Sequence, residues 1–178
     1  MTATRNASTT EVADNDFVIS RTFAAQRELV FQVWTDPEHM KHWWGPKGFT
    51  SPVCNMDLRP GGGMHYCLRS ADGQEIWGKF VYREVAAPGR LVLVDGFSNA
   101  AGEIVRHPMS PTWPLELLTT ITFDDEGGRT KLTVRWGPLP SATEEERKTF
   151  NESRASMQQG WTGTLDQLTD YLAEVIKK

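Results

Sequence analysis

The chain has 178 residues, with 19 basic and 23 acidic side chains and a formal net charge of -4 at pH 7. This length fits one domain rather than two, and it suffices to bury a core without a disulfide or a structural metal. No block of Lys or Arg forms a stripe that would follow phosphates, which argues against nucleic acid as a partner. No apolar run approaches the roughly 20 residues that span a bilayer, and the N-terminus lacks the apolar region of a signal peptide. We therefore expect a cytoplasmic protein without membrane insertion.

The first 15 residues are rich in Thr, Ala, Asn and Ser and offer little to bury. We expect residues 1–15 to be a disordered leader and residues 16–176 to form a single domain. Alternation of Phe17, Ile19 and Phe23 with more polar neighbours predicts a strand at the start of this domain.

Two short helices are expected next. The first covers 28–34, where apolar residues have helical spacing. The second begins after Asp36, which is suited to cap it, with Pro37 in the first helical position. It ends before the run Trp43-Trp44-Gly45-Pro46, which marks the change from helix to strand.

Six further strands are predicted after the helices. The first covers 52–57 and is joined by a glycine turn to a partner at 64–69. Alternating positions in the five strands from residue 64 onward are Met64, Tyr66 and Leu68; Ile76, Gly78, Phe80 and Tyr82; Leu91 and Leu93; Leu117, Thr119, Ile121 and Phe123; and Leu132, Val134 and Trp136. Residues 98–114 contain three prolines and break the alternation, so we expect a long loop there.

A long helix over about 142–174 is predicted to end the domain, with Ser141 and Glu144 at capping-box spacing. One stripe of this helix is apolar and consists of Met157, Trp161, Leu165, Leu168 and Leu172. Gly160 and Gly163 each cost about 1 kcal/mol relative to alanine in a helix. We expect close approach to the sheet, or a kink over a cavity, to explain them.

This order of elements predicts an α+β fold, in which a curved antiparallel sheet of six to seven strands wraps around the C-terminal helix. Such a helix-grip arrangement leaves a hollow between the sheet and the helix.

Several runs of sequence, in this order and with ordinary spacing, carry a family resemblance. They are Arg21–Ala25, Val30–Glu38, Trp43–Phe49, Asp57–Gly62, Arg90–Val92 and Gly160–Leu165. They resemble bacterial single-domain members of the family named for the C-terminal domain of the activator of the heat-shock-protein-90 ATPase, in the START-like superfamily. The resemblance implies a helix-grip fold. It leaves function open, because the superfamily includes lipid carriers, cyclases, hormone receptors and co-chaperone domains.

The eukaryotic co-chaperone that names this family has an additional N-terminal domain. A leader of 15 residues cannot supply one, so we do not carry chaperone activation over to this chain.

The main candidate site is a cavity lined by aromatic side chains on the inner faces of the strands and the last helix. The candidate ligand-binding residues are Trp44, Tyr66, Phe80, Tyr82, Phe97, Trp113, Trp136 and Trp161. Aromatic walls with a few polar groups are typical of pockets for small apolar molecules. The alternative is that these rings only fill the core.

The polar candidates for acid or base catalysis are Glu103 and His107 in the long loop and Arg135 beside Trp136. Catalysis would need two such groups within about 3 Å of a substrate atom. His65 lies on the strand face opposite Tyr66, which favours a position facing solvent.

Neither a metal site nor a nucleophile is indicated. His39 and His42 have helical spacing but no third ligand nearby in sequence, so a surface pair is favoured. Cys54 and Cys67, nearly opposite in the predicted hairpin, lack an activating partner and are expected to stay reduced. We expect no cofactor.

Three functions remain open. The first is binding of a small apolar or aromatic molecule. The second is an enzyme of the cyclase or hydrolase kind, and the third is a protein-interaction domain that contacts a chaperone or a second copy of the chain.

Overall fold

The computed structural model describes residues 16–178, and the predicted leader at 1–15 lies outside them. The elements in chain order are β1 (Phe17–Phe23), α1 (Arg27–Thr35), α2 (Pro37–Met40), β2 (Thr50–Met56), β3 (Gly63–Arg69), β4 (Glu75–Ala86), β5 (Arg90–Phe97), β6 (Leu117–Asp125), β7 (Thr130–Pro138), α3 (Glu144–Glu152) and α4 (Arg154–Ile176). The predicted order of one strand, two helices and six strands is confirmed.

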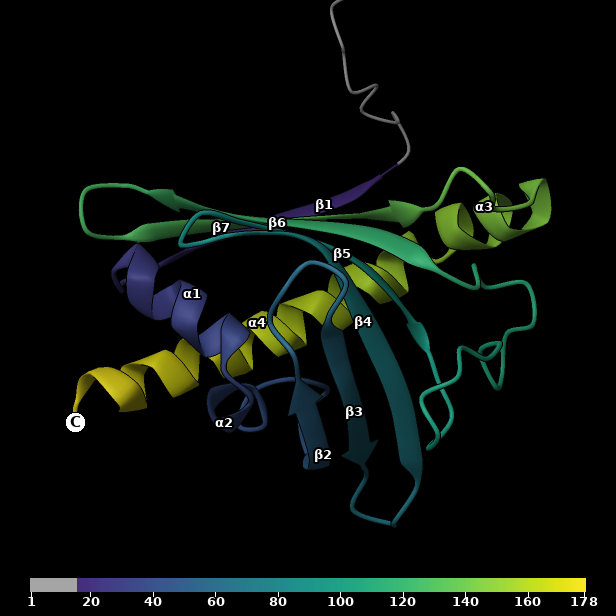
Figure 1. Ribbon diagram of the computed structural model, residues 1–178, viewed down its shortest axis with the longest axis horizontal. Coiled ribbons are helices and arrows are strands. Elements are labelled where there is room, and N and C mark those ends of the chain that lie inside the picture. The colour runs from purple at the N-terminus through teal and green to yellow at the C-terminus, as the bar shows by residue number, and fades with distance from the viewer. Residues whose placement is uncertain (1–15) are drawn as a thin grey trace, which may run out of the picture.

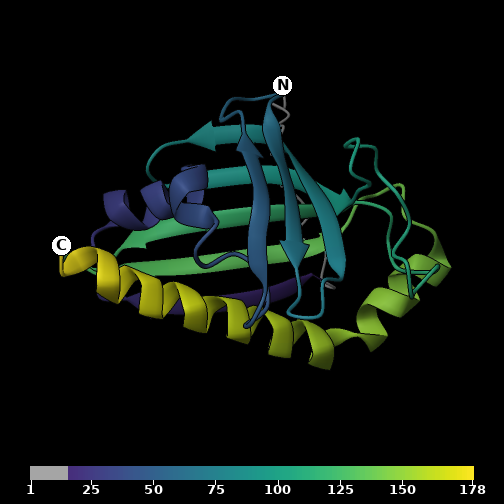
Figure 2. The ribbon, with the colours of Figure 1, turned by 90° about the horizontal axis from the view of Figure 1, so that it is seen from below.

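The seven strands form one antiparallel sheet in the order β1-β7-β6-β5-β4-β3-β2. The sheet arches over α4, which crosses its concave face (Figure 1). Helices α1 and α2 cover another part of the same face (Figure 2). The architecture confirms the helix-grip prediction.

The core lies between the concave face and the helices. Most inward-facing side chains of β1, β6 and β7 are buried there, as the alternation predicts, whereas Arg21 and Trp136 remain partly exposed. The C-terminal part of α4 contributes Leu165, Leu168 and Leu172, which are at most 3% exposed. Burying each such side chain contributes about 2 kcal/mol, so this contact holds α4 to the sheet.

The prediction of one uninterrupted terminal helix is wrong. The chain leaves helical geometry at Ser153, which ends α3 and begins α4. The predicted capping box is also displaced: Thr143 rather than Ser141 is the N-cap, and it exchanges hydrogen bonds with Glu146. Glu146 accepts a further hydrogen bond from Arg106 at 2.5 Å, so the start of α3 is tied to the loop at 98–116.

The two cysteines are not opposite each other. Cys67 pairs with Val53 across β2 and β3, whereas Cys54 pairs with Tyr66. A shift of one residue places the two thiols on opposite faces of the sheet. Both cysteines are free, and burial raises the pKa of Cys54 to about 11, which leaves its thiol a poor nucleophile at neutral pH.

The glycines of α4 do not mark a close approach to the sheet, and the expectation of close packing is wrong. A Cβ atom at Gly160 or at Gly163 would meet no heavy atom within 4 Å. Both lie within the uninterrupted helix α4. No packing requirement therefore excludes a side chain at either position.

Replacing Gly163 by alanine should stabilise the protein. We expect Gly163→Ala to raise the free energy of unfolding by up to about 1 kcal/mol, because alanine has the higher helix propensity and has room here. Urea unfolding followed by circular dichroism measures this change. A loss of stability would contradict this expectation, because it would show that the added methyl group meets a neighbouring group.

Candidate ligand-binding cavity

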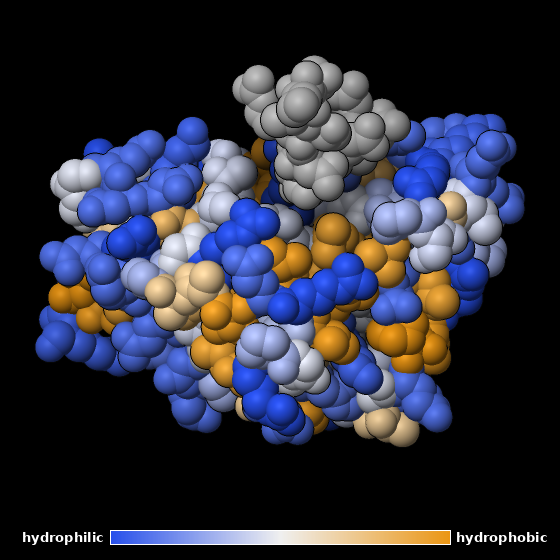
Figure 3. All heavy atoms as spheres, turned by 45° about the horizontal axis from the view of Figure 1, so that its top comes forward, coloured by the Kyte–Doolittle hydropathy of each residue, from blue (hydrophilic) through white to orange (hydrophobic). Residues whose placement is uncertain are grey.

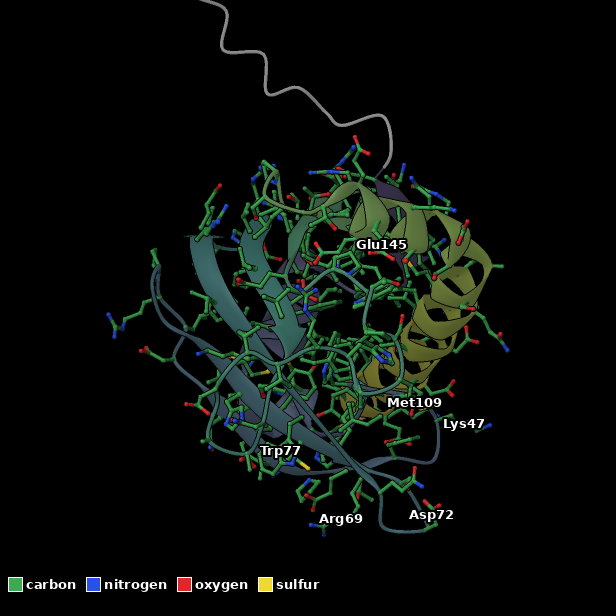
Figure 4. All side chains as sticks on the ribbon, turned by 90° about the vertical axis from the view of Figure 1, so that its right-hand side faces the viewer. Lys47, Arg69, Asp72, Trp77, Met109 and Glu145 are labelled. Carbon is green, nitrogen blue, oxygen red and sulfur yellow. The ribbon has the colours of Figure 1, made fainter. Side chains whose placement is uncertain are left out.

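A cavity of about 500 Å³ lies between the concave face of the sheet and the first half of α4. Its walls come from β3, β5, β6 and β7, from α4, and from the loops at 41–49 and 98–116. Figure 4 views the molecule from the side where the loop at 98–116 crosses between sheet and helix. The cavity therefore occupies the hollow that the fold predicts.

Aromatic rings form a continuous arc around this cavity. Trp44 contacts Tyr66 at one end and Trp161 on α4, with ring centroids 5.9 and 6.0 Å apart. Trp161 lies 6.1 Å from Trp136, which lies 5.7 Å from Trp113. Edge-on and tilted contacts of this kind stabilise the rings against each other, so the wall is preorganised.

The predicted binding residues divide into two groups. Those that line the cavity are Trp44, Tyr66, Phe97, Trp113, Trp136 and Trp161. Phe80 and Tyr82 belong to the core, where they are 5% and 2% exposed, and they are not part of the lining. Phe80 instead packs against the lining residue Trp44, with the two ring centroids 5.3 Å apart.

The adjacent tryptophans 43 and 44 have different environments. Trp43 is 1% exposed, and its indole N–H donates to the Val33 carbonyl at 3.0 Å. Trp44 turns toward the cavity, and its buried indole N–H has only a poorly aligned contact with the Tyr66 hydroxyl. Gly45 follows with a φ of 104°, a value that glycine adopts without strain.

A carboxyl group that the sequence interpretation missed lies at the base of the cavity. Asp95 on β5 accepts a hydrogen bond from the Thr119 hydroxyl at 2.6 Å and one from the Trp136 indole at 3.3 Å. These donors come from β6 and β7, so three neighbouring strands position one carboxyl. The available signal was the alternation of β5, which places Asp95 on the same face as Leu91 and Leu93.

Burial determines the protonation of Asp95. It raises the pKa of Asp95 to about 7, against the lowering effect of its hydrogen bonds with Thr119 and Trp136. The residue is half-buried, and its side chain lines the cavity. Burial, with the charge of Asp95, also raises the pKa of Tyr66, so the phenol stays neutral at physiological pH.

The predicted catalytic candidates are not brought together. Glu103 is exposed and accepts from the Asn99 amide at 2.7 Å, and Arg135 lies 3.7 Å from Asp16. Only His107 lines the cavity, where its ring packs 4.6 Å from Phe97. Burial lowers the pKa of His107, which favours the neutral imidazole.

The other histidines have structural contacts. His65 stacks on Trp77 with ring centroids 5.1 Å apart, and it hydrogen-bonds the Asn99 carbonyl, so it is half-buried rather than freely solvated. His39 and His42 both pack against Tyr171. Within residues 16–178, no group of three potential ligands could hold a metal ion.

The mouth of the cavity lies where the loops at 41–49 and 98–116 face α4. Pro46, Ser156 and Gly160 line the cavity and are exposed. Lys47 and Met109, labelled in Figure 4, adjoin the lining residues Pro46 and Ser110. Since Gly160 has no side chain, the helix leaves this entrance open.

Fold and cavity together define a helix-grip domain with an internal aromatic cavity. Residues 24–173 match the family model described as Activator of Hsp90 ATPase homolog 1-like protein. The chain belongs to this family, as the sequence resemblance predicts.

Solved structures share the fold. An NMR structure of an Arthrobacter aurescens protein has a TM-score of 0.74 at 23% identity, covering 90% of this chain and 87% of that one. A crystal structure of a Mycobacterium smegmatis protein has a TM-score of 0.72 at 23% identity, covering 89% of this chain and 90% of that one. A crystal structure of a Nitrosomonas europaea protein has a TM-score of 0.72 at 24% identity, covering 93% of this chain and 99% of that one. None of the curated proteins compared matches the chain.

The burial of Asp95 predicts a pH-dependent difference in stability. Because the folded-state pKa is raised above its usual value of 3.8, the folded protein binds more protons between pH 4 and 7, and Asp95 costs progressively more stability as the pH rises through this window. We expect Asp95→Asn to be more stable than the wild type at pH 8, by an amount on the order of a few kcal/mol. This advantage should shrink as the pH falls toward 4.

Urea unfolding between pH 4 and 8 measures this difference. Asp124→Asn is the matched control, because Asp124 is an exposed carboxyl on β6. An Asp95→Asn advantage that is independent of pH would contradict the assignment.

Proposed function

We propose that this protein binds a small, largely apolar molecule in the cavity between the sheet and α4. The observation that carries the proposal is the cavity itself: about 500 Å³, walled by aromatic rings, with one half-buried carboxyl at its base. Ligand pockets have volumes of about 300 to 1,000 Å³, apolar walls and a few placed polar groups. No helix among residues 16–178 is long and apolar enough to cross a membrane.

The arrangement of the rings favours binding over simple core filling. Rings that served only as core would close the space between sheet and helix, since protein interiors pack to about the density of organic crystals. Here Trp113, Trp136 and Trp161 contact each other along the wall and leave the volume open. A ligand would bury the ring surface that now faces this volume.

Polar groups in the lining would orient the ligand. The buried indole N–H of Trp44 has only a poorly aligned contact with the Tyr66 hydroxyl, and a buried donor that is not satisfied costs about 1 to 3 kcal/mol. A ligand acceptor is one partner that would remove this cost. The hydroxyls of Ser110 and Ser156 add weaker sites near the mouth.

Native mass spectrometry of the protein purified from its own host tests the proposal. We expect a population with added mass, and mass spectrometry of the released compound should identify an apolar molecule that fits the cavity. A chain found only at its own mass, with a cavity that takes up no apolar probe, would contradict binding.

A side chain at the mouth should slow ligand entry. We expect Gly160→Leu to lower the rate at which an added apolar probe binds by at least fivefold, because its side chain would stand at the entrance. Gly163→Leu is the matched control, since residue 163 lies on the same helix, gains the same side chain and is outside the lining. Equal association rates in the two variants, measured by stopped-flow fluorescence, would show that ligands do not pass residue 160.

Acid–base catalysis is a second candidate, favoured by one observation. Asp95, whose pKa burial raises to about 7, shares the cavity with His107, and a general acid or base works best when its pKa lies near the operating pH. If the co-purifying molecule is a substrate, the wild type will convert it and Asp95→Asn will not. Unchanged turnover in Asp95→Asn would remove this candidate.

Contact with a chaperone or a second copy has weaker support. Val18 and Val81 are large hydrophobic residues exposed on the convex face, on β1 and β4, and three strands separate these two. Hydrophilic residues interrupt the hydrophobic ones on the part of the surface seen in Figure 3. Patches that bind partners are usually larger and continuous.

A further inference from the structure

The carboxyl group of Asp95 lacks a positive partner. Its hydrogen bonds come from Thr119 and Trp136, both neutral. Within the described chain, none of the salt bridges involves Asp95, and the charged neighbour that acts on its pKa, Glu116, is also acidic. Buried carboxylates in proteins are normally paired with a cation, because an isolated charge away from water is unfavourable.

The remaining lining cannot supply the missing charge. Asp95 and His107 are the two residues of the cavity lining whose side chains titrate near neutral pH. Burial lowers the pKa of His107 and so disfavours the imidazolium. Lys47 adjoins the mouth, but its exposed side chain extends outward (Figure 4). Any cation at Asp95 must therefore come with the ligand.

The aromatic wall restricts which cation this is. The Trp136 indole donates directly to Asp95, and the rings of Trp161 and Trp113 lie 6.1 and 5.7 Å from the Trp136 ring. Indole rings attract cations, most strongly where water is excluded, and they recognise alkylated ammonium groups. A hydrated inorganic ion would leave most of the cavity without apolar contacts.

We propose that the cavity binds an organic monocation, in which an ammonium group lies at Asp95 among the indole rings and an apolar body fills the rest of the volume. This inference rests on the proposed function and names the class of its ligand. A neutral ligand would favour the protonated acid at Asp95 and gain no charge interaction, and an anion would be repelled by the carboxylate.

Binding should depend on pH with a defined sign. The ammonium binds the carboxylate form, so its affinity rises as the pH increases through the pKa of Asp95, near 7. The other titratable groups around the site are Tyr66 on β3, His107 in the loop and Glu116 before β6. Protonation of His107 would also weaken cation binding at low pH, and its effect must be separated from that of Asp95.

Displacement of a neutral fluorescent probe, N-phenyl-1-naphthylamine, separates these effects. The competitors are phenyltrimethylammonium and tert-butylbenzene, which have nearly the same shape and differ in charge. At pH 8 we expect the cation to displace the probe at a concentration at least tenfold lower than the neutral compound. At pH 5.5 this preference should fall several-fold.

Two variants complete the experiment. Asp95→Asn should reduce the preference to within about twofold, and Asp124→Asn on the same sheet should retain it. Any pH dependence that persists in Asp95→Asn belongs to His107. The pH series on the wild type tests the proposal even if Asp95→Asn does not fold.

The outcomes distinguish the two proposals. If the wild type does not bind the neutral probe and neither competitor binds, the proposed function fails and the inference fails with it. If the probe binds but tert-butylbenzene competes as well as the cation, or the cation binds better at pH 5.5, the inference is overturned and binding of an apolar molecule stands.

Discussion

The structure depends on one constraint: helix α4 must cover the part of the concave face of a seven-stranded sheet that α1 and α2 leave open. The C-terminal half of α4 does so with Leu165, Leu168 and Leu172, which close the space completely. Its first half presents Met157 and Trp161 to the hollow, with the exposed residues Ser156 and Gly160 at its mouth. Side chains as small as these two do not close the mouth, so the hollow stays open there.

The same constraint explains the chemistry of the base of the cavity. Where the C-terminal half of α4 packs tightly, the strands present mainly apolar residues, with Arg21 of β1 paired to Asp166. Where α4 does not pack tightly, β5 presents Asp95, which is held by Thr119 and Trp136 from the next two strands. In an environment of low dielectric constant, a carboxyl group without a countercharge favours its neutral form, and a cation would strongly favour the charged form. Site electrostatics and cavity shape thus have one origin.

The sequence predicts the fold and much of the cavity wall, because alternation assigns each strand residue to a face and the family resemblance supplies the curvature. It does not predict the cluster at Asp95. Alternation places this residue inward, but its contact with Thr119 and Trp136 depends on register across β6 and β7, over separations of 24 and 41 residues. The N-cap of α3 was misplaced for a related reason: Thr143 rather than Ser141 is the cap, and its partner Glu146 also binds Arg106, a residue of a distant loop. Glu103 and Arg135 failed as site candidates because the polarity of a side chain does not reveal which surface it faces.

The central claim is that a carboxyl group lies desolvated and without a countercharge at the base of an aromatic cavity. Titration of the Asp95 side-chain carboxyl carbon by ¹³C NMR, in protein freed of any bound molecule, tests this most directly. We predict that its resonance titrates with a pKa of about 7. A pKa near 4, the value of a solvated aspartate, would contradict the account.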